Sequence, residues 1–475
     1  MIASATQEHV PFSSPQIGWA EQHPDDWWSA CKIAIPRVLA IAGLHGRDIA
    51  GVGFSGQMHG AVLLDESSAV VRPALIWCDV RTEAQCHDLT RRIGAERIIE
   101  LTCNPALTNF TLTKLLWVRE NEPEKWQRVR SVMLPKDYVR FRLTGERATD
   151  MADASGTLML DVANRRWSNE MLEAGEIEHN LLPSLHESTD VCAQVSAIGA
   201  KATGLHEGTP VVAGAGDQAA GAIGLGIVTP GAVSATIGTS GVVFAATDRP
   251  ALDRLGRLHT FCHALPRRWH VMGVTQAAGL SLRWFRDQFG AGRDDGRDPY
   301  ERLTDEAATA EPGCNGLIWT PYLMGERTPH LDSNVRGALV GLTASHTRAD
   351  VVRSILEGVA FSLKDTFRIF EEMKVPVKNV RLGGGGARSA LWRQIQADIY
   401  GHEVEMVDAE EGAAFGACVL AGVGVGIWPS VDEVCTSVIG VAERIAPRAE
   451  FAVNLNQNYE AYRRVYGATR EIMGR

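Results

Sequence analysis

Apolar residues recur every three or four positions between Asp350 and Met373, which is the spacing of one face of an α-helix. The apolar positions in this segment are Val352, Ile355, Leu356, Val359, Leu363, Phe367 and Phe370. The pattern predicts a long helix with one buried face. Shorter apolar runs, such as Val233–Ile237 and Val380–Leu382, predict strands.

The stretch from Val211 to Phe244 combines an acidic side chain with a glycine-rich turn. Asp217 follows a short apolar strand on a glycine-bounded turn. Further on, two predicted strands, Val233–Ile237 and Val242–Phe244, flank a turn at 238–241 that can aim several backbone N–H groups at one anion. A carboxylate and an anion-binding hairpin about twenty residues apart predict phosphoryl transfer with Asp217 as base. The alternative is a turn that contains glycine for steric reasons alone.

The turn at Ser55–His59 carries hydrogen-bonding groups at the end of a predicted strand. His59 could donate a hydrogen bond to a hydroxyl group, although a lone histidine is more often structural. A second polar cluster contains Trp77, Asp79 and Arg81, and an aromatic face beside an acid and a base suits a sugar or other polyol. A surface ion pair explains Asp79 and Arg81 equally well.

Three further segments bear on nucleotide binding. Gly51, Gly53 and Gly56 fit the pattern GxGxxG, but a strand rather than a helix follows them, which disfavours a dinucleotide site. The run Gly383–Gly386 joins a strand to the predicted helix Ser389–Tyr400 and can hold a nucleotide by backbone contact, or it allows tight packing. A further helix is expected to begin near Gly279, whose missing side chain can admit a flat ligand. A charged loop is expected at Asp294–Asp305. The small-residue helix expected at Gly412–Ala421 needs close approach by a neighbour.

Composition limits the classes of protein to consider. The chain has 475 residues, 45% of them hydrophobic and 22% charged, which predicts a globular protein with two large domains. Its formal net charge is -10 and it has no lysine-arginine block, so nucleic acids and anionic membrane surfaces are disfavoured as partners. Nine cysteines occur singly, which disfavours zinc and disulfides and predicts a reducing cytoplasm. Neither a signal peptide nor a run of about 18 apolar residues is visible.

Two long motifs carry a family resemblance. The first is FTLTKLLWVREN at residues 110–121, and the second runs from Gly337 through Gly341 and Asp350 to Glu357. Four shorter blocks agree with them: GQMHG at 56–60, LPKDY at 134–138, FCHALP at 261–266 and GERTPH at 325–330. From about Trp19 onward the chain resembles the FGGY carbohydrate kinases, and within that family its xylulose-phosphorylating members.

The resemblance implies an α/β fold of two actin-like, ribonuclease-H-like domains around a cleft. Residues 1–222 would form the sugar-binding domain and residues 223–475 the nucleotide-binding domain. The implied reaction is ATP-dependent phosphorylation of D-xylulose to D-xylulose 5-phosphate in pentose catabolism, with Mg2+, by a cytoplasmic enzyme for which a homodimer is plausible.

The resemblance also implies roles for particular residues. Asp217 falls on the catalytic base, and the sugar would be bound by Met58, His59, Asp217 and Gln218. No protein ligand is assigned to a metal. Gln218 stands where an asparagine is expected for a xylulose kinase. Glutamine keeps the amide group but has a longer side chain. The nucleotide would be held by Gly238, Thr239, Ser240, Gly279, Arg283, Gly385, Gly386 and Ser389.

One family feature is missing from the sequence. A first phosphate hairpin of the form Asp-x-Gly-Thr-Ser is expected near the N-terminus, and the chain instead begins at what resembles the third strand, about 25 to 40 residues later. We therefore expect a poor or inactive kinase with a truncated first domain. Three alternatives stay open: a kinase for another ketose or polyol, a non-catalytic sugar- or nucleotide-binding remnant, and a dehydrogenase built on Gly51–Gly56.

Overall fold

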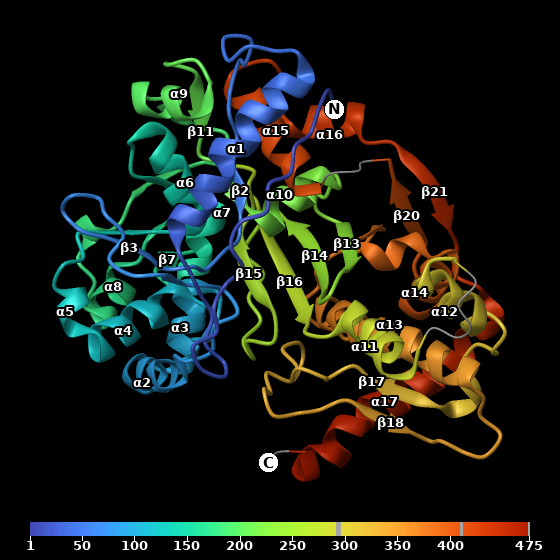
Figure 1. The fold of residues 1–475 in the computed structure, drawn as a ribbon. Coiled ribbons are helices and arrows are strands. Elements are labelled where there is room, and N and C mark those ends of the chain that lie inside the picture. Colours follow the sequence, from blue (N-terminus) through green and yellow to red (C-terminus); the bar gives the residue numbers. More distant parts are fainter. Residues whose placement is uncertain (291–295, 409–411, 474–475) are drawn as a thin grey trace.

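The computed structural model describes residues 1–290, 296–408 and 412–473, and Figure 1 shows them as two halves. The first half, in blue to green, is built from helices and short strand pairs. Its helices are α1 (Pro24–Ala42), α2 (Glu83–Ile93), α3 (Ala95–Thr102), α4 (Thr111–Asn121), α5 (Pro123–Trp126), α6 (Pro135–Thr144), α7 (Met151–Ala154), η1 (Ser155–Thr157), α8 (Asn169–Gly175), η2 (His179–Leu181) and α9 (Ala197–Thr203).

The strands of the first half form two-stranded pairs, two of them parallel. The parallel pairs are β2 (Ser55–Gly56) with β12 (Ala215–Gly216), and β6 (Ala148–Asp150) with β9 (Ser184–His186). The antiparallel pairs are β1 (Glu21–Gln22) with β4 (Ala74–Leu75), β3 (Val62–Leu64) with β5 (Ser131–Met133), β7 (Leu160–Asp161) with β8 (Arg166–Trp167), and β10 (Val191–Gln194) with β11 (Pro210–Val212).

The second half is organised around one mixed seven-stranded sheet. Its strands lie in the order β15 (His259–Cys262), β16 (Trp269–Thr275), β14 (Gly241–Thr247), β13 (Ala232–Ile237), β19 (Asn379–Gly383), β20 (Val404–Val407) and β21 (Val441–Ile445). β13, β19 and β20 are parallel to one another, and the other neighbours are antiparallel. β17 (Ile318–Thr320) pairs separately with β18 (Ala338–Val340).

The remaining elements begin with α10, which follows β12 directly. They are α10 (Asp217–Gly224), α11 (Ala278–Phe289), α12 (Pro299–Ala307), η3 (Cys314–Gly316), α13 (Arg348–Glu372), η4 (Gly385–Arg388), α14 (Ala390–Tyr400), α15 (Gly412–Gly424), α16 (Val431–Val438), η5 (Ala449–Phe451) and α17 (Ala452–Met473).

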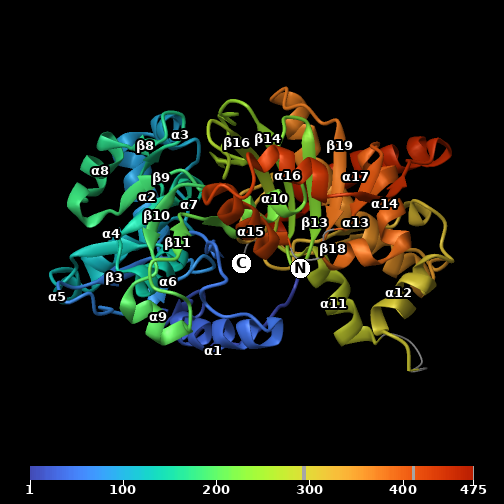
Figure 2. The ribbon, with the colours of Figure 1, turned by 90° about the horizontal axis from the view of Figure 1, so that it is seen from above.

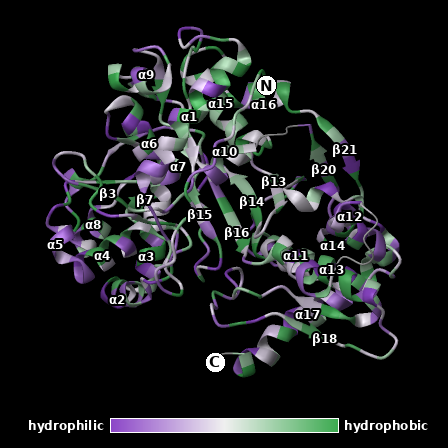
Figure 3. Cartoon of the chain, in the orientation of Figure 1, coloured by the Kyte–Doolittle hydropathy of each residue, from purple (hydrophilic) through white to green (hydrophobic). Residues whose placement is uncertain are grey.

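The two faces of the large sheet belong to different cores. Side chains alternate along a strand, so Val233 and Val243 pack with α13 on one face, whereas Phe244 and Met272 point to the other. That second face shares a core with Phe110 and other residues of the first half. β14 and β16 accordingly carry mostly hydrophobic residues in Figure 3. The halves are therefore joined by continuous apolar packing along β14, β16 and β15.

Helices α10 and α15 lie side by side between the two halves (Figure 2). A Cβ atom on Gly416 would lie 1.9 Å from the Ala220 carbonyl oxygen, and one on Gly224 would lie 2.0 Å from the Gly412 carbonyl oxygen. Neither glycine can be replaced without separating the helices. The expectation that the small-residue helix at Gly412–Ala421 needs a close neighbour is thereby confirmed, with α10 as that neighbour.

Most of the predicted elements are present. The periodic segment at Asp350–Met373 is helix α13, which begins with a capping box between Thr347 and Asp350. The predicted hairpin is formed by β13 and β14. The element that follows Gly56 is strand β3, not the helix whose N-terminus a dinucleotide site requires.

The expected charged loop at Asp294–Asp305 is wrong from Pro299 onward. Residues 294 and 295 lie outside the described residues, and α12 begins at Pro299, where the Asp298 carboxylate accepts a hydrogen bond from the Tyr300 amide at 2.7 Å. An aspartate N-cap followed by proline is a helix start signal. Leu303 and Ala307 then bury one face of the helix, and the charged residues only cover the other.

Candidate active site

A cavity of about 810 Å³ lies between α10 and the inner strands β14, β13, β19 and β20 of the large sheet. Asp217 and Gln218 line it from α10, and Gly238 and Ser240 line it from the turn between β13 and β14. The structure thus brings together the carboxylate and the hairpin that the sequence singled out. The same cavity is bordered by Gly384 and Gly385, after β19.

Asp217 is the first residue of α10 and directly follows strand β12. Its side chain is half-buried, and Gln218 Nε2 donates a hydrogen bond to Asp217 Oδ2 at 2.9 Å. Burial raises the pKa of Asp217, while the amide of Gln218 and the backbone N–H groups at the start of α10 act in the opposite direction. A carboxylate with a raised pKa is a better proton acceptor than one in water, provided that it is still ionised.

The turn at 238–241 is attached to the N-terminus of α11. The Gly279 amide donates to the Gly238 carbonyl at 2.9 Å, and the Leu280 amide donates to the Thr239 carbonyl at 3.1 Å. A Cβ atom on Gly279 would lie 2.4 Å from the Gly238 oxygen, so this approach requires glycine. Within the described part of the chain, the amides of Thr239 and Ser240 donate to no protein acceptor, which leaves two N–H groups for an anion.

A second cavity of about 360 Å³ adjoins the first, and Gly238, Gly385 and Arg388 border both. Seven of the eight expected nucleotide residues line this second cavity, and Ser240 lines the first. Those in the second cavity are Gly238, Thr239, Gly279, Arg283, Gly385, Gly386 and Ser389. Ser389 also caps α14, because its hydroxyl accepts a hydrogen bond from the Trp392 amide at 3.3 Å.

Sequence reasoning missed the α12 side of the second cavity. Asp298, Tyr300, Glu301 and Thr304 line it opposite the glycine turn. The available signal was the Asp298-Pro299 helix start, which was obscured by the surrounding charges. Arg388, an exposed cation that borders both cavities, was also missed, although it lies only two residues after the glycine run.

Met58 and His59 lie behind the cavity rather than on its lining. Both are buried, and a Cβ atom on Gly216 would lie 2.7 Å from Met58 Cγ, so this loop supports the strand before Asp217. His59 Nδ1 lies 2.7 Å from the Gly156 carbonyl oxygen, and burial lowers the pKa of His59 to about 3. A neutral ring that donates from Nδ1 leaves Nε2 as an acceptor. The expectation that His59 donates to a ligand hydroxyl is therefore corrected: its remaining nitrogen accepts.

Lys114 holds the His59 backbone in an unusual conformation. His59 has φ 68°, in the left-handed region, and its carbonyl accepts hydrogen bonds from Lys114 Nζ at 2.9 Å and from the Thr111 hydroxyl at 3.1 Å. Lys114 Nζ also donates to the Asn109 carbonyl at 2.6 Å. No carboxylate among the described residues pairs with this buried ammonium group, and burial lowers the pKa of Lys114 to about 7.

Lys114 should make the stability of the protein depend on pH. Its pKa is lower in the folded chain than in the unfolded chain, so the unfolded chain binds more protons between about pH 7 and pH 10 and stability rises with pH across that window. The contribution is on the order of a few kcal/mol. Urea unfolding of the wild type and of Lys114→Met at several pH values would measure it. A variant that keeps the full rise would contradict this assignment.

Asp79 and Arg81 form a buried ion pair, which corrects the surface-pair alternative. Arg81 lies 2.7 Å from Asp79, and its guanidinium carbon lies 3.6 Å from the centre of the Trp19 ring. Asp79 also accepts a hydrogen bond from the Ala20 amide at 2.6 Å. These groups fasten the N-terminal segment to the first half and line neither cavity.

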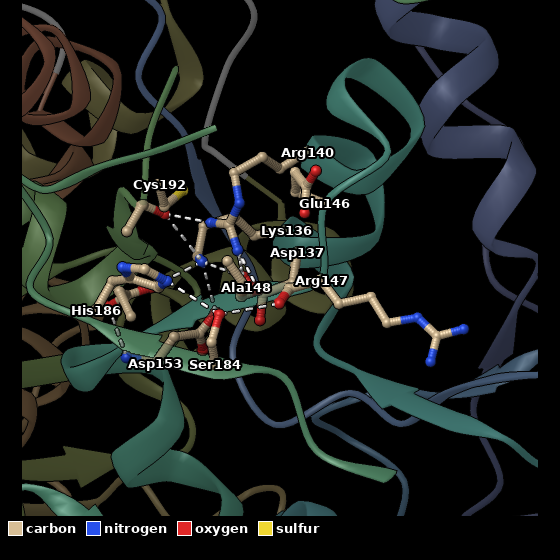
Figure 4. A network of polar contacts seen from close by, with 12 residues as sticks. Lys136, Asp137, Arg140, Glu146, Arg147, Ala148, Asp153, Ser184, His186 and Cys192 are labelled. Carbon is tan, nitrogen blue, oxygen red and sulfur yellow. Dashed lines mark hydrogen bonds and ion pairs between the residues drawn. The ribbon is translucent and has the colours of Figure 1, made fainter. Parts of the chain in front are cut away.

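The described residues contain one group of three side chains with metal-ligand spacing, Asp137, Asp150 and Asp153. Lys136 Nζ lies 2.6 Å from Asp137 (Figure 4), and it lies 2.7 Å from Asp150. The ammonium group therefore serves as the cation of this cluster, and the cluster is a poor fit for a metal ion.

Among the helices of the described residues, none combines the length and apolar character needed to cross a membrane.

Comparison with known proteins identifies the family. Residues 1–224 match the N-terminal domain of the FGGY family of carbohydrate kinases, and residues 233–425 match its C-terminal domain. A xylulose kinase from Bacillus subtilis (strain 168) is 38% identical over 471 residues, which is 99% of this chain and 93% of that protein. A gluconokinase from the same strain is 32% identical over 445 residues, covering 92% of this chain and 86% of that protein.

A solved structure agrees with these matches. The crystal structure of a xyloylose kinase from Brucella ovis superposes with a TM-score of 0.91 at 34% identity, covering 98% of this chain and 94% of that one. The expected fold, two actin-like domains of the sugar kinase type, is confirmed. The chain belongs to the FGGY family of carbohydrate kinases.

Proposed function

We propose that this chain transfers a phosphate from ATP to D-xylulose, giving D-xylulose 5-phosphate, with Asp217 as the base. One observation carries the proposal: Asp217 faces the same cavity as the glycine turn at 238–241. A base and an anion-binding turn on opposite walls are what in-line attack of a hydroxyl on a phosphate requires. The xylulose kinase relatives support D-xylulose as the acceptor.

Membership of a carbohydrate kinase family gives a sugar and ATP as the substrates, with a divalent metal. In our proposal the sugar lies against α10, where Asp217 takes the hydroxyl proton and the Gln218 amide orients the sugar. His59 accepts a hydrogen bond through Nε2 once the halves close over the substrate. Met58 and His59 also set the position of Gly216 and, through it, of Asp217.

The two adjoining cavities support the position of the nucleotide. The phosphates would lie over the free amides of Thr239 and Ser240, near the positive end of α11. The nucleoside would occupy the second cavity, between Gly279 and Gly385 on one side and Tyr300 on the other. When bound, Mg2+ would neutralise phosphate charge. We assign it no protein ligand, because the three-carboxylate cluster in the described residues already holds Lys136.

The proposal also covers the organisation of the chain. We divide it into a sugar-binding domain at 1–222 and a nucleotide-binding domain at 223–475, so that the division falls within α10. We also propose that the protein is a cytoplasmic homodimer. Light scattering of the purified protein would measure its mass in solution and so test the dimer.

Release of ADP should be measured across a panel of D-xylulose, L-xylulose, D-ribulose, glycerol and gluconate. We expect the largest kcat/KM with D-xylulose. The largest value with gluconate would replace the proposed substrate, and the gluconokinase relative makes this the main competitor. Saturable binding of ATP and sugar without ADP release would instead favour the inactive kinase or non-catalytic remnant considered in the sequence analysis.

A further inference from the structure

A buried ion-pair network contains Lys136, Asp137 and Arg140 (Figure 4). Lys136 and Arg140 both donate to Asp137 Oδ1, at 2.6 and 2.9 Å. Lys136 also pairs with Asp150 at 2.7 Å. All four side chains are fully buried. Since buried charges are stable only when paired, these two cations and two carboxylates form a balanced set.

The network is connected to the candidate active site by a backbone group. Arg140 donates a hydrogen bond to the Ala213 carbonyl, and Lys136 Nζ lies 3.5 Å from the same oxygen. Ala213 follows β11 and precedes Asp217 by four residues. Gly214, next in the chain, has φ 77° and would clash with the Phe54 carbonyl if it carried a Cβ atom. The two cations thus fix the start of the segment that carries Asp217.

Asp153 is the third carboxylate of the cluster and is bound differently. Its Oδ2 lies 3.6 Å from Lys136 Nζ, the longest of the three contacts, and neither of its oxygens has a hydrogen-bond partner among the described residues. The side chain is completely buried. A Cβ atom on Gly216 would lie 3.4 Å from Asp153 Oδ1, so Asp153 borders the residue just before Asp217.

The charges do not balance if Asp153 is ionised. Lys136 and Arg140 are already matched by Asp137 and Asp150, so an ionised Asp153 would be an unpaired buried charge beside Asp217. Burial, followed by the charges of Asp150, Asp137 and Asp217, raises the pKa of Asp153 well above its usual range, against the attraction of Lys136. Lys136 and Arg140, in contrast, hold the pKa of Asp137 below its usual range despite burial.

We propose that Asp153 is a positioning residue that keeps its proton at neutral pH, so that a neutral acid separates the base Asp217 from the ion-pair network. An ionised Asp153 would oppose ionisation of Asp217, which the reaction needs as a carboxylate. The role toward Asp217 rests on the proposed function, whereas the protonation of Asp153 does not.

The charged and titratable groups around Asp153 come from four neighbouring elements. His186 is kept neutral at pH 7 by burial, which lowers its pKa, and it contributes no cation to the cluster. The His259 ring, on β15, forms its hydrogen bond with the Asn104 side chain and not with Asp153. The groups are Lys136, Asp137 and Arg140 on α6, Asp150 on β6, Asp217 on α10 and His186 on β9.

Asp153→Asn tests the proposal, because asparagine has the shape of a protonated aspartate and cannot ionise. The folded wild type holds a proton that the unfolded chain releases above about pH 4, so its stability falls as pH rises toward the folded pKa. We expect the urea midpoint of Asp153→Asn to equal that of the wild type below about pH 4 and to exceed it increasingly at higher pH. The infrared C=O band of a protonated carboxyl group should be present in the wild type at about pH 7 and diminished in the variant.

Asp137→Asn is the matched control, since it makes the same chemical change at a carboxylate that two cations require. We expect it to lower the urea midpoint at every pH above about 5. The proposal is overturned if Asp153→Asn loses as much stability as Asp137→Asn, or if the infrared band is as strong in Asp153→Asn as in the wild type.

A third measurement tests the role toward Asp217. In the pH profile of kcat/KM, the pH at which activity falls on the acid side should be the same in Asp153→Asn as in the wild type. The reason is that the substitution replaces one neutral group by another. A fall moved to lower pH would mean that the wild-type residue is ionised and would overturn the proposal. Absence of phosphorylation with every sugar would refute the proposed function, and the urea and infrared results, which need no substrate, would still decide the protonation of Asp153.

Discussion

Replacing Asp217 by asparagine is expected to lower kcat for sugar phosphorylation about 100- to 10,000-fold, the usual contribution of a general base. Asparagine has nearly the shape of aspartate but cannot accept the hydroxyl proton. The loss should appear in kcat and not in the KM for ATP, because the glycine turn across the cavity is unchanged. Coupled measurement of ADP release at saturating sugar and ATP gives both constants.

The control for this variant is Asp248→Asn, which makes the same change at an exposed aspartate just after β14. We expect its kcat to stay within about twofold of the wild type, as for surface substitutions generally. The raised pKa of Asp217 adds a second check, because activity should fall as pH drops through that pKa and the base becomes protonated. Full turnover by Asp217→Asn in a folded protein would remove Asp217 from this role.

Replacing Gly384 by alanine is expected to raise the KM for ATP by about tenfold or more, which corresponds to about 1.4 kcal/mol of binding. Gly384 has φ 75° and ψ −173°, a region that only glycine adopts without strain. An added Cβ atom would also lie 2.5 Å from the Ile237 carbonyl oxygen, at the end of β13. Relief of that clash must move the glycine turn away from the 238–241 hairpin.

Gly401→Ala separates the effect on the site from ordinary backbone strain. Gly401 also has a positive φ, 70°, but an added Cβ atom would meet nothing within 4 Å, and it lies at the opposite end of α14. We expect it to lower stability by roughly 1 kcal/mol without changing the KM for ATP. Equal KM values for the two variants would show that the position of Gly384 does not matter for the nucleotide. Urea unfolding confirms that each variant is folded.

Local pattern was sufficient for several parts of the molecule. Apolar spacing predicted α13, because a helix repeats every 3.6 residues whatever it packs against. The hairpin around Gly238–Gly241 could be predicted because strands and glycine turns have sequence signatures only a few residues long. The two long family motifs then gave the sugar kinase fold, which the comparisons confirmed.

Other features were hidden because their causes lie far away in the sequence. His59 donates to the carbonyl of Gly156, 97 residues later, and this contact alone decides which ring nitrogen can accept a ligand hydroxyl. From the sequence, Asp79 and Arg81 could be sugar-binding residues or a surface ion pair, and only the structure shows them buried, with Arg81 against the Trp19 ring. α12 was mistaken for a charged loop because charged residues surround its start and its buried face contains only Leu303, Thr304 and Ala307.

The sequence by itself predicted most of the elements and singled out Asp217 and the glycine turns as candidate site residues, since these follow from periodicity, glycine placement and motif. Only the tertiary structure decided the protonation and pairing of the buried groups. Lys114, Lys136 and Asp153 look like ordinary charged residues in the sequence, and their behaviour depends on how much water burial removes and on which opposite charges folding brings within about 4 Å.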